Sequence, residues 1–166
     1  MNALVIDAFE FCRLKERLEG ETLVADLPRL AKESVDRSGR IMWSLQGGTN
    51  SEGHAQLILD VSGTVRLLCQ RCLTPLDFNI ASKSMLLLAK DEASADELDA
   101  SLDDDDASEV IVGSKAFNVA DLIEDEALLA LPQAPKHEAC SGQPIQNAPE
   151  EMEKVSPFAV LKKLRQ

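Results

Sequence analysis

The stretch Leu67-Leu-Cys-Gln-Arg-Cys-Leu-Thr-Pro-Leu76 joins two segments in which apolar and polar residues alternate. Its cysteines, Cys69 and Cys72, are separated by two residues, a spacing that lets both sulfur atoms face one point. Such a turn can hold a tetrahedral metal ion, form a redox disulfide or serve only to reverse the chain. The two cysteines alone leave these three alternatives open.

The alternation on both sides of this turn predicts β-strands. Apolar residues keep one parity over residues 57–69, which indicates either one strand bent at Gly63 or a hairpin with a three-residue loop there. A long strand is expected over residues 76–89, and shorter strands over residues 40–46 and 109–112. Strands that follow one another closely in the chain predict a mainly antiparallel sheet.

Helical periodicity precedes and follows these strands. We expect one helix over residues 7–19, stopped by Gly20, and a second that begins after Asp26 and ends by Gly39. Residues 118–131 form the most apolar helical segment, and a short last helix is expected over 158–164. The prediction is a single α+β domain over residues 1–166, with helices flanking the sheet.

The acidity of the chain is concentrated in one segment. Its formal net charge is −12, and residues 91–109 contain ten acidic residues and no basic residue. The rest of the chain therefore carries a net charge of only −2. Charge repulsion and a low apolar content predict a disordered acidic loop, a flexible insert within the domain.

A second pair of candidate metal ligands, His137 and Cys140, is separated from Cys72 by 64 residues. Together with Cys69 and Cys72 they could supply the four ligands of one structural zinc ion. The alternative is that His137 and Cys140 lie on a loose extended segment, because the prolines around them give it no evident reason to reach the first pair. Cys12, beside two phenylalanines, is expected to be a buried thiol rather than a ligand.

The composition limits the compartment and the class of partner. The chain has no apolar run long enough to span a bilayer and no secretory signal at its start, so we expect a cytoplasmic protein without a membrane partner. Cysteines are normally reduced there, which disfavours a disulfide framework. The acidic charge disfavours a broad surface for DNA or RNA. We find no nucleotide-binding fingerprint and no catalytic triad.

Four motifs together resemble the bacterial YceD family. They are Val65-Arg-Leu-Leu-Cys-Gln-Arg-Cys-Leu73, Glu126-Ala-Leu-Leu-Ala-Leu-Pro132, Pro135-Lys-His137 followed by Cys140, and Pro157-Phe-Ala-Val-Leu161. The resemblance extends from about Leu23 to the C-terminus. Ser156 stands where the family pattern leads us to expect asparagine, and both residues are good helix N-caps.

The resemblance implies a non-enzymatic factor in ribosome biogenesis that is needed for the synthesis, processing or accumulation of 23S ribosomal RNA. Expected partners are ribosomal or ribosome-assembly proteins, and precursor large-subunit RNA through local basic patches. These patches are Arg13/Lys15/Arg17, Arg66/Arg71 and Lys162/Lys163/Arg165. Two alternatives remain: a thiol-disulfide redox protein that uses Cys69 and Cys72, and an interaction module stabilised by structural zinc.

Overall fold

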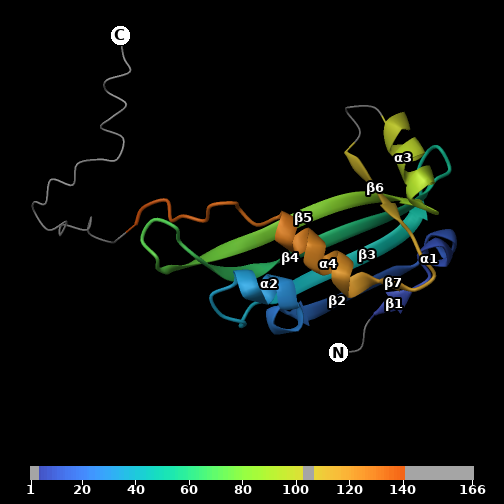
Figure 1. The fold of residues 1–166 in the computed structure, drawn as a ribbon. Helices are drawn as coiled ribbons and strands as arrows, with labels where there is room; N and C mark the ends of the chain where they lie inside the picture. The colour runs from blue at the N-terminus through green and yellow to red at the C-terminus, as the bar shows by residue number, and fades with distance from the viewer. Residues whose placement is uncertain (1–3, 103–106, 141–166) are drawn as a thin grey trace, which may run out of the picture.

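A five-stranded sheet forms the centre of the computed structural model, which describes residues 4–102 and 107–140 (Figure 1). The strand order is β2-β3-β4-β5-β6; the pairs β2–β3, β3–β4 and β4–β5 are antiparallel, and β6 runs parallel to β5. The predicted α+β fold with a mainly antiparallel sheet is thus confirmed. The strands are β2 (Arg17–Leu23), β3 (Arg40–Thr49), β4 (Ala55–Leu68), β5 (Pro75–Ala89) and β6 (Ser108–Val112).

Strand β4 is the continuous strand that the sequence offered as one of two alternatives. It pairs with β5 without interruption from Gln56, opposite Leu87, to Leu68, opposite Pro75. Gly63 lies within this ladder, where a Cβ atom would stand 2.3 Å from the carbonyl oxygen of Arg40 on β3. The absence of a side chain at position 63 therefore allows the two strands to approach, and no hairpin forms there.

The described helices that build the core are α1 (Ala8–Leu14), α2 (Pro28–Glu33) and α4 (Val119–Leu129). Phe11 of α1 and Ile123 of α4 are buried with Ile41 and Leu59 of the sheet, so these elements share one hydrophobic core. The short strands β1 (Val5–Ile6) and β7 (Phe117–Asn118) pair with each other, and a 3-10 turn, η1 (Val24–Asp26), leads into α2. No described helix has the length and apolarity needed to cross a membrane.

The two faces of the sheet differ because side chains alternate along each strand. Ile41, Leu45 and Leu59 point to the helices and are fully buried. Met42, their neighbour on β3, points the other way and is 59% exposed, and Asp60 on β4 is exposed as well. The sheet therefore has one face that packs on the core and one open face.

The acidic segment contains a helix, α3 (Glu92–Ser101), so the prediction of a disordered loop is wrong for these residues. Asp91 and Ser94 form a capping box in which each side chain accepts a hydrogen bond from the other residue's backbone N–H. No α3 residue is buried, so its acidic side chains extend into solvent. Residues 103–106, which include four of the ten acids, lie outside the described residues, as does the helix expected over 158–164.

The N-terminal helix is half as long as its periodicity predicted. It ends at Leu14 because Lys15 adopts a left-handed backbone conformation, with φ of 53°. The chain then enters β2, where Leu18 lies opposite Leu45 of β3. Pairing with the sheet thus replaces the last part of the expected helix, and Gly20 lies inside a strand.

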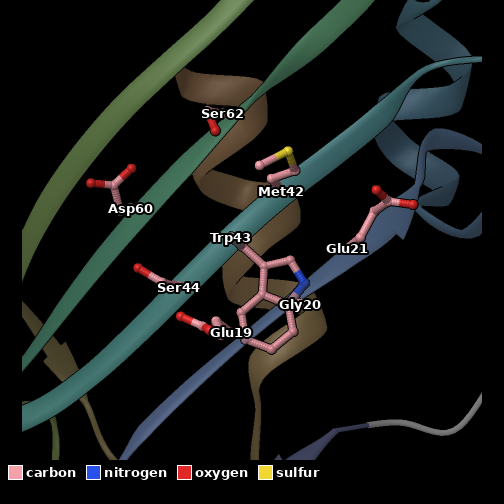
Figure 2. A pocket seen from close by; sticks show the side chains of 8 residues that line it. All are labelled: Glu19, Gly20, Glu21, Met42, Trp43, Ser44, Asp60 and Ser62. Carbon is pink, nitrogen blue, oxygen red and sulfur yellow. The ribbon is translucent and has the colours of Figure 1, made fainter.

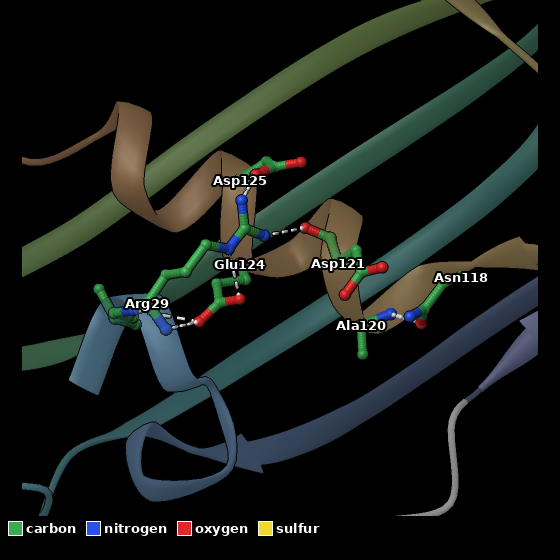
Figure 3. Close-up of polar contacts among 7 residues, drawn as sticks. Arg29, Asn118, Ala120, Asp121, Glu124 and Asp125 are labelled. Carbon is green, nitrogen blue, oxygen red and sulfur yellow. Dashed lines mark hydrogen bonds and ion pairs between the residues drawn. The ribbon is translucent and has the colours of Figure 1, made fainter. Parts of the chain in front are cut away.

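Helix α2 receives its N-terminal cap from a residue far along the chain. Leu27 at its N-cap position makes no side-chain hydrogen bond. Instead, the Glu124 carboxylate of α4 accepts hydrogen bonds from the backbone N–H groups of Arg29, at 2.6 Å, and Leu30, at 3.0 Å (Figure 3). The Arg29 guanidinium donates to the same carboxylate at 2.8 Å and also pairs with Asp125. Glu124 is only 3% exposed, so a buried charge is compensated by three donors.

Replacing Glu124 with alanine should lower the free energy of unfolding by about 2–4 kcal/mol, because it leaves helix N–H groups and Arg29 without their buried acceptor. Chemical denaturation of the purified protein measures this loss. The matched control is Asp125→Ala, which removes an exposed carboxylate from the same arginine and should cost less than about 1 kcal/mol. Equal losses in the two variants would contradict the capping role.

Candidate metal centre

The first two cysteines lie on the tight connection between β4 and β5. The backbone N–H of Cys69 donates to the carbonyl oxygen of Thr74 at 2.9 Å, and the N–H of Leu73 donates to that of Cys69, also at 2.9 Å. Leu73 has a left-handed backbone with φ of 56°. These features turn the chain so that Cys69 is fully buried while Cys72 is half-buried.

The segment that follows α4 returns to this turn. The carbonyl oxygen of Pro135 accepts a hydrogen bond of 2.9 Å from the backbone N–H of Gln70, which lies between the two cysteines. Two residues later, the backbone N–H of His137 points to the sulfur of Cys69 at 3.5 Å. The backbone of this segment thus contacts both the backbone and a cysteine side chain of the turn.

Four potential ligand atoms meet where the two segments touch. The Sγ atoms of Cys69 and Cys140 are 3.8 Å apart, and the Sγ of Cys72 is 3.3 Å from Nδ1 of His137. All four ligand atoms lie within 4.8 Å of one another. Two sulfurs bound to one tetrahedral zinc ion at about 2.3 Å stand about 3.8 Å apart, so the observed spacing fits such an ion.

The second ring nitrogen of His137 also has a partner. Its Nε2 lies 3.2 Å from the carbonyl oxygen of Pro75, which can only accept a hydrogen bond. This contact favours the tautomer with the proton on Nε2 and leaves the lone pair of Nδ1 directed at the sulfur atoms. Histidines that bind zinc usually donate their other N–H in this way.

The electrostatic surroundings favour a thiolate at Cys69. Burial of Cys69 acts to raise its pKa, but hydrogen bonds from the backbone N–H groups of Cys72, His137 and Arg71 together outweigh burial and lower the pKa of Cys69 to about 5. Hydrogen bonds from Thr74, from its side chain first and its backbone second, lower the pKa of Cys72. Since the thiolate is the form that binds zinc, the lowered pKa values of Cys69 and Cys72 both favour metal binding.

The pKa values of the other two potential ligands, His137 and Cys140, are shifted upwards. Hydrogen bonds with Cys69 and then with Cys72 raise the pKa of His137. Burial, followed by hydrogen bonds with the same two cysteines, raises the pKa of Cys140. Both groups lie close to Cys69 and Cys72, and a metal ion would bind them in their deprotonated forms.

Cys12 is a fourth cysteine of a different kind. It is 1% exposed within the core, and its thiol donates to the carbonyl oxygen of Gln56 at 3.2 Å. Burial raises the pKa of this thiol. The prediction of a buried Cys12 thiol is therefore confirmed, and Cys12 provides an internal control for the other three cysteines.

The structure brings together all four residues that the sequence singled out. The alternative in which His137 and Cys140 remain apart from the first cysteine pair is wrong, because the carbonyl oxygen of Pro135 accepts a hydrogen bond from Gln70 on the turn. Proline has no N–H to donate, but its carbonyl oxygen can still accept. Thr74 and Pro75 are supporting residues that sequence reasoning missed. The only signal for them was their position two and three residues after Cys72.

Comparison with known proteins identifies a family. A family model described as "Large ribosomal RNA subunit accumulation protein YceD" matches residues 57–165, which include both halves of the cluster. No solved structure matches the chain.

Replacing Cys69 with alanine should release the segment after α4, because its buried sulfur contacts both His137 and Cys140. Trypsin cleavage after Lys136, followed by mass spectrometry, should become several-fold faster than in the wild type. The matched control, Cys12→Ala, removes a buried thiol from the core without touching this segment. Equal acceleration in both variants would indicate general loosening of the fold instead.

Proposed function

The chain belongs to the YceD family of large ribosomal RNA subunit accumulation proteins, and we propose that it acts as a non-enzymatic factor in the biogenesis of the large ribosomal subunit. The family name implies a role in the accumulation of that RNA. The family match over residues 57–165 is the observation that carries the proposal. Its finer form is a need for this protein in the synthesis, processing or accumulation of 23S ribosomal RNA.

The surface charges favour action through a protein partner over broad RNA binding. Arg66 is held by Asp36 at 3.1 Å and by Asp77 at 3.2 Å, and Arg17 is held by Glu19 at 3.2 Å. Two of the basic patches expected from the sequence therefore each contain an arginine paired with a neighbouring acid, and the third patch lies outside the described residues. Binding to RNA phosphates depends on free basic side chains.

The second part of the proposal is that Cys69, Cys72, His137 and Cys140 bind one structural zinc ion. Three sulfurs and one imidazole nitrogen complete a tetrahedral set, which is typical of structural zinc sites. A zinc ion bound there would fasten the segment after α4 to the β4–β5 turn. It would supply cohesion rather than chemistry, because no coordination position remains for water or substrate.

The geometry gives less support to a thiol-disulfide enzyme. The low pKa of Cys69 is a feature of reactive cysteines, but its side chain is fully buried. The cysteine pair also lies between two strands, and not at the N-terminus of a helix as in thioredoxin-like proteins. A substrate disulfide would have no access to the sulfur that is most readily ionised.

Deletion of the gene should lower large-subunit ribosomal RNA relative to small-subunit RNA, and the wild-type gene should restore the ratio. Quantifying both RNAs in the same cells under several growth conditions provides the test. A complemented strain that carries Cys12→Ser should behave like the wild type. An unchanged ratio in the deletion strain would contradict the proposed role.

Protein purified without a metal-affinity tag should contain about one equivalent of zinc, because a closed four-ligand site binds the ion tightly. Elemental analysis should find little zinc in Cys69→Ser/Cys72→Ser and a wild-type content in Cys12→Ser. Chelation should also lower the thermal midpoint of the wild type sharply. Metal-free wild-type protein that folds normally would overturn the zinc proposal and leave the ribosomal one intact.

A further inference from the structure

Strand β2 lies at one edge of the sheet with its outer side unpaired. Within residues 4–102 and 107–140 it pairs with β3 alone, through the whole of Arg17–Leu23. An unpaired edge presents backbone N–H and C=O groups that can pair with another strand. Recognition by strand addition uses such an edge for affinity and uses hollows on either side for alternate side chains of the added strand.

A hollow of about 500 Å³ adjoins β2 on the open face of the sheet (Figure 2). Met42 on β3 contributes an exposed apolar side chain to it. The residues that line it come from three adjacent strands, and three of these residues are acidic. They are Glu19, Gly20, Glu21, Met42, Trp43, Ser44, Asp60 and Ser62.

A second hollow, of about 270 Å³, adjoins the same strand on the face that packs on the helices. It is mainly apolar, with two acids among its lining residues. These residues are Leu4, Glu21, Thr22, Asp26, Leu27, Trp43, Ala120 and Ile123. Glu21 and Trp43 line both hollows, so the two hollows flank one point on β2.

Trp43 reaches this point because residue 20 is glycine. A Cβ atom at Gly20 would lie 2.9 Å from Cζ2 of the Trp43 ring, so any larger residue would displace the indole. The indole Nε1–H donates to the hydroxyl of Thr22 on the same edge strand at 3.1 Å. The aromatic ring is thus held against the backbone of the free edge, where an added strand would contact it.

The charge around the edge selects the partner. The two hollows are lined by four acids, Glu19, Glu21, Asp26 and Asp60, and by no basic residue. Arg17 and Arg40 pair with Glu19 and Glu21, but all four of these side chains are between 47% and 69% exposed. Exposed pairs contribute little stability, so an incoming base can replace either arginine.

We propose that the free edge of β2 binds an extended segment of a basic protein in which lysine or arginine alternates with apolar residues. Its backbone adds a strand to the sheet, its basic side chains face Glu19 and Glu21, and its apolar side chains enter the hollow beside Trp43 and Leu27. This inference rests on the proposed action through a protein partner and states the chemistry of that partner. It depends on the acidity of the β2 edge and is independent of the zinc proposal.

A second copy that pairs antiparallel along the whole of β2, centred on Gly20, fits this edge less well than a basic segment does. Antiparallel self-pairing centred on Gly20 places Glu19 of one copy opposite Glu21 of the other on the same face of the sheet. Like charges directly opposite each other destabilise a strand pair. The basic segment places a positive charge at the same positions.

The peptide Lys-Val-Lys-Val-Lys-Val-Lys provides a direct test on the full chain. Trp43 is the single tryptophan and the chain has no tyrosine, so intrinsic fluorescence reports on the proposed site alone. The peptide should change this fluorescence and bind at least about tenfold more tightly than its scrambled form Lys-Lys-Lys-Lys-Val-Val-Val, which has the same charge. Equal affinity of the two peptides, or no binding by either, would overturn the proposal.

Charge reversal separates the edge from the general acidity of the protein. Glu19→Lys/Glu21→Lys should weaken binding of the alternating peptide by at least about tenfold, because it removes both acids that face the basic side chains. The matched control Glu92→Lys/Glu97→Lys makes the same change on α3 and should weaken it by less than about threefold. Equal effects of the two pairs would show diffuse attraction and refute a built site.

Light scattering of the wild type tests the competing occupant. A monomer is expected. A dimer that dissociates in the Glu19→Lys/Glu21→Lys variant would assign the edge to a second copy and overturn the proposal. These outcomes are independent of the ribosomal RNA ratio in a deletion strain, so failure of one proposal can be distinguished from failure of the other.

Discussion

The uninterrupted pairing of β4 with β5 is the constraint on which the rest of the structure depends. Thirteen residue pairs, from Gln56↔Leu87 to Leu68↔Pro75, keep a single register. A shift by one residue would turn the buried leucines of β4 to the open face, so the hydrophobic core fixes this register strongly. Because the register is fixed, the turn that carries Cys69 and Cys72 has a fixed position at one end of the sheet.

Helix α4 connects this turn to the core. Glu124 caps α2, and Glu126 accepts a hydrogen bond from Ser82 of β5, so the helix is attached both to another helix and to the sheet. The chain then leaves α4 and docks on the turn through Pro135. Closing so long a loop between Cys72 and His137 carries an entropic cost. The attachment of α4 to the core offsets most of that cost. A metal ion would then need to hold only the short segment after α4.

Sequence patterns correctly predicted the elements that depend mainly on residues close together in the chain. Alternation identified β4 and β5 because one face of each strand is buried, and the cysteine spacing identified the turn. The acidic helix α3 was missed since composition describes the repulsion between its acids but not the capping box at Asp91. The same limit explains why the helix expected over residues 7–19 is too long. Its last residues pair with β3 instead, and this tertiary contact cannot be read from helical periodicity.

The same distinction applies to the candidate sites. All four potential zinc ligands were found because cysteine and histidine are rare residues whose spacing is informative. Their meeting was not predictable, since it depends on a backbone contact between Gln70 and Pro135. The edge of β2 was invisible to sequence reasoning, because its hollows are built from residues on five different elements and its key glycine resembles a helix stop.

The two proposed sites lie at different places on the sheet. The cysteine cluster lies at the turn that joins β4 to β5 (Figure 1), whereas the acidic hollows adjoin the edge strand β2, and the larger one extends across β3 to Asp60 and Ser62 of β4. Both depend on the same core, but they share no side chain. If zinc is bound at the cluster as proposed, its removal would therefore loosen the segment around Lys136 and leave the edge strand intact. On the two proposals, a protein with a net charge of −12 would contribute to the accumulation of an RNA by holding a basic protein through its acids, while a zinc ion at the cysteine cluster would secure the segment after α4.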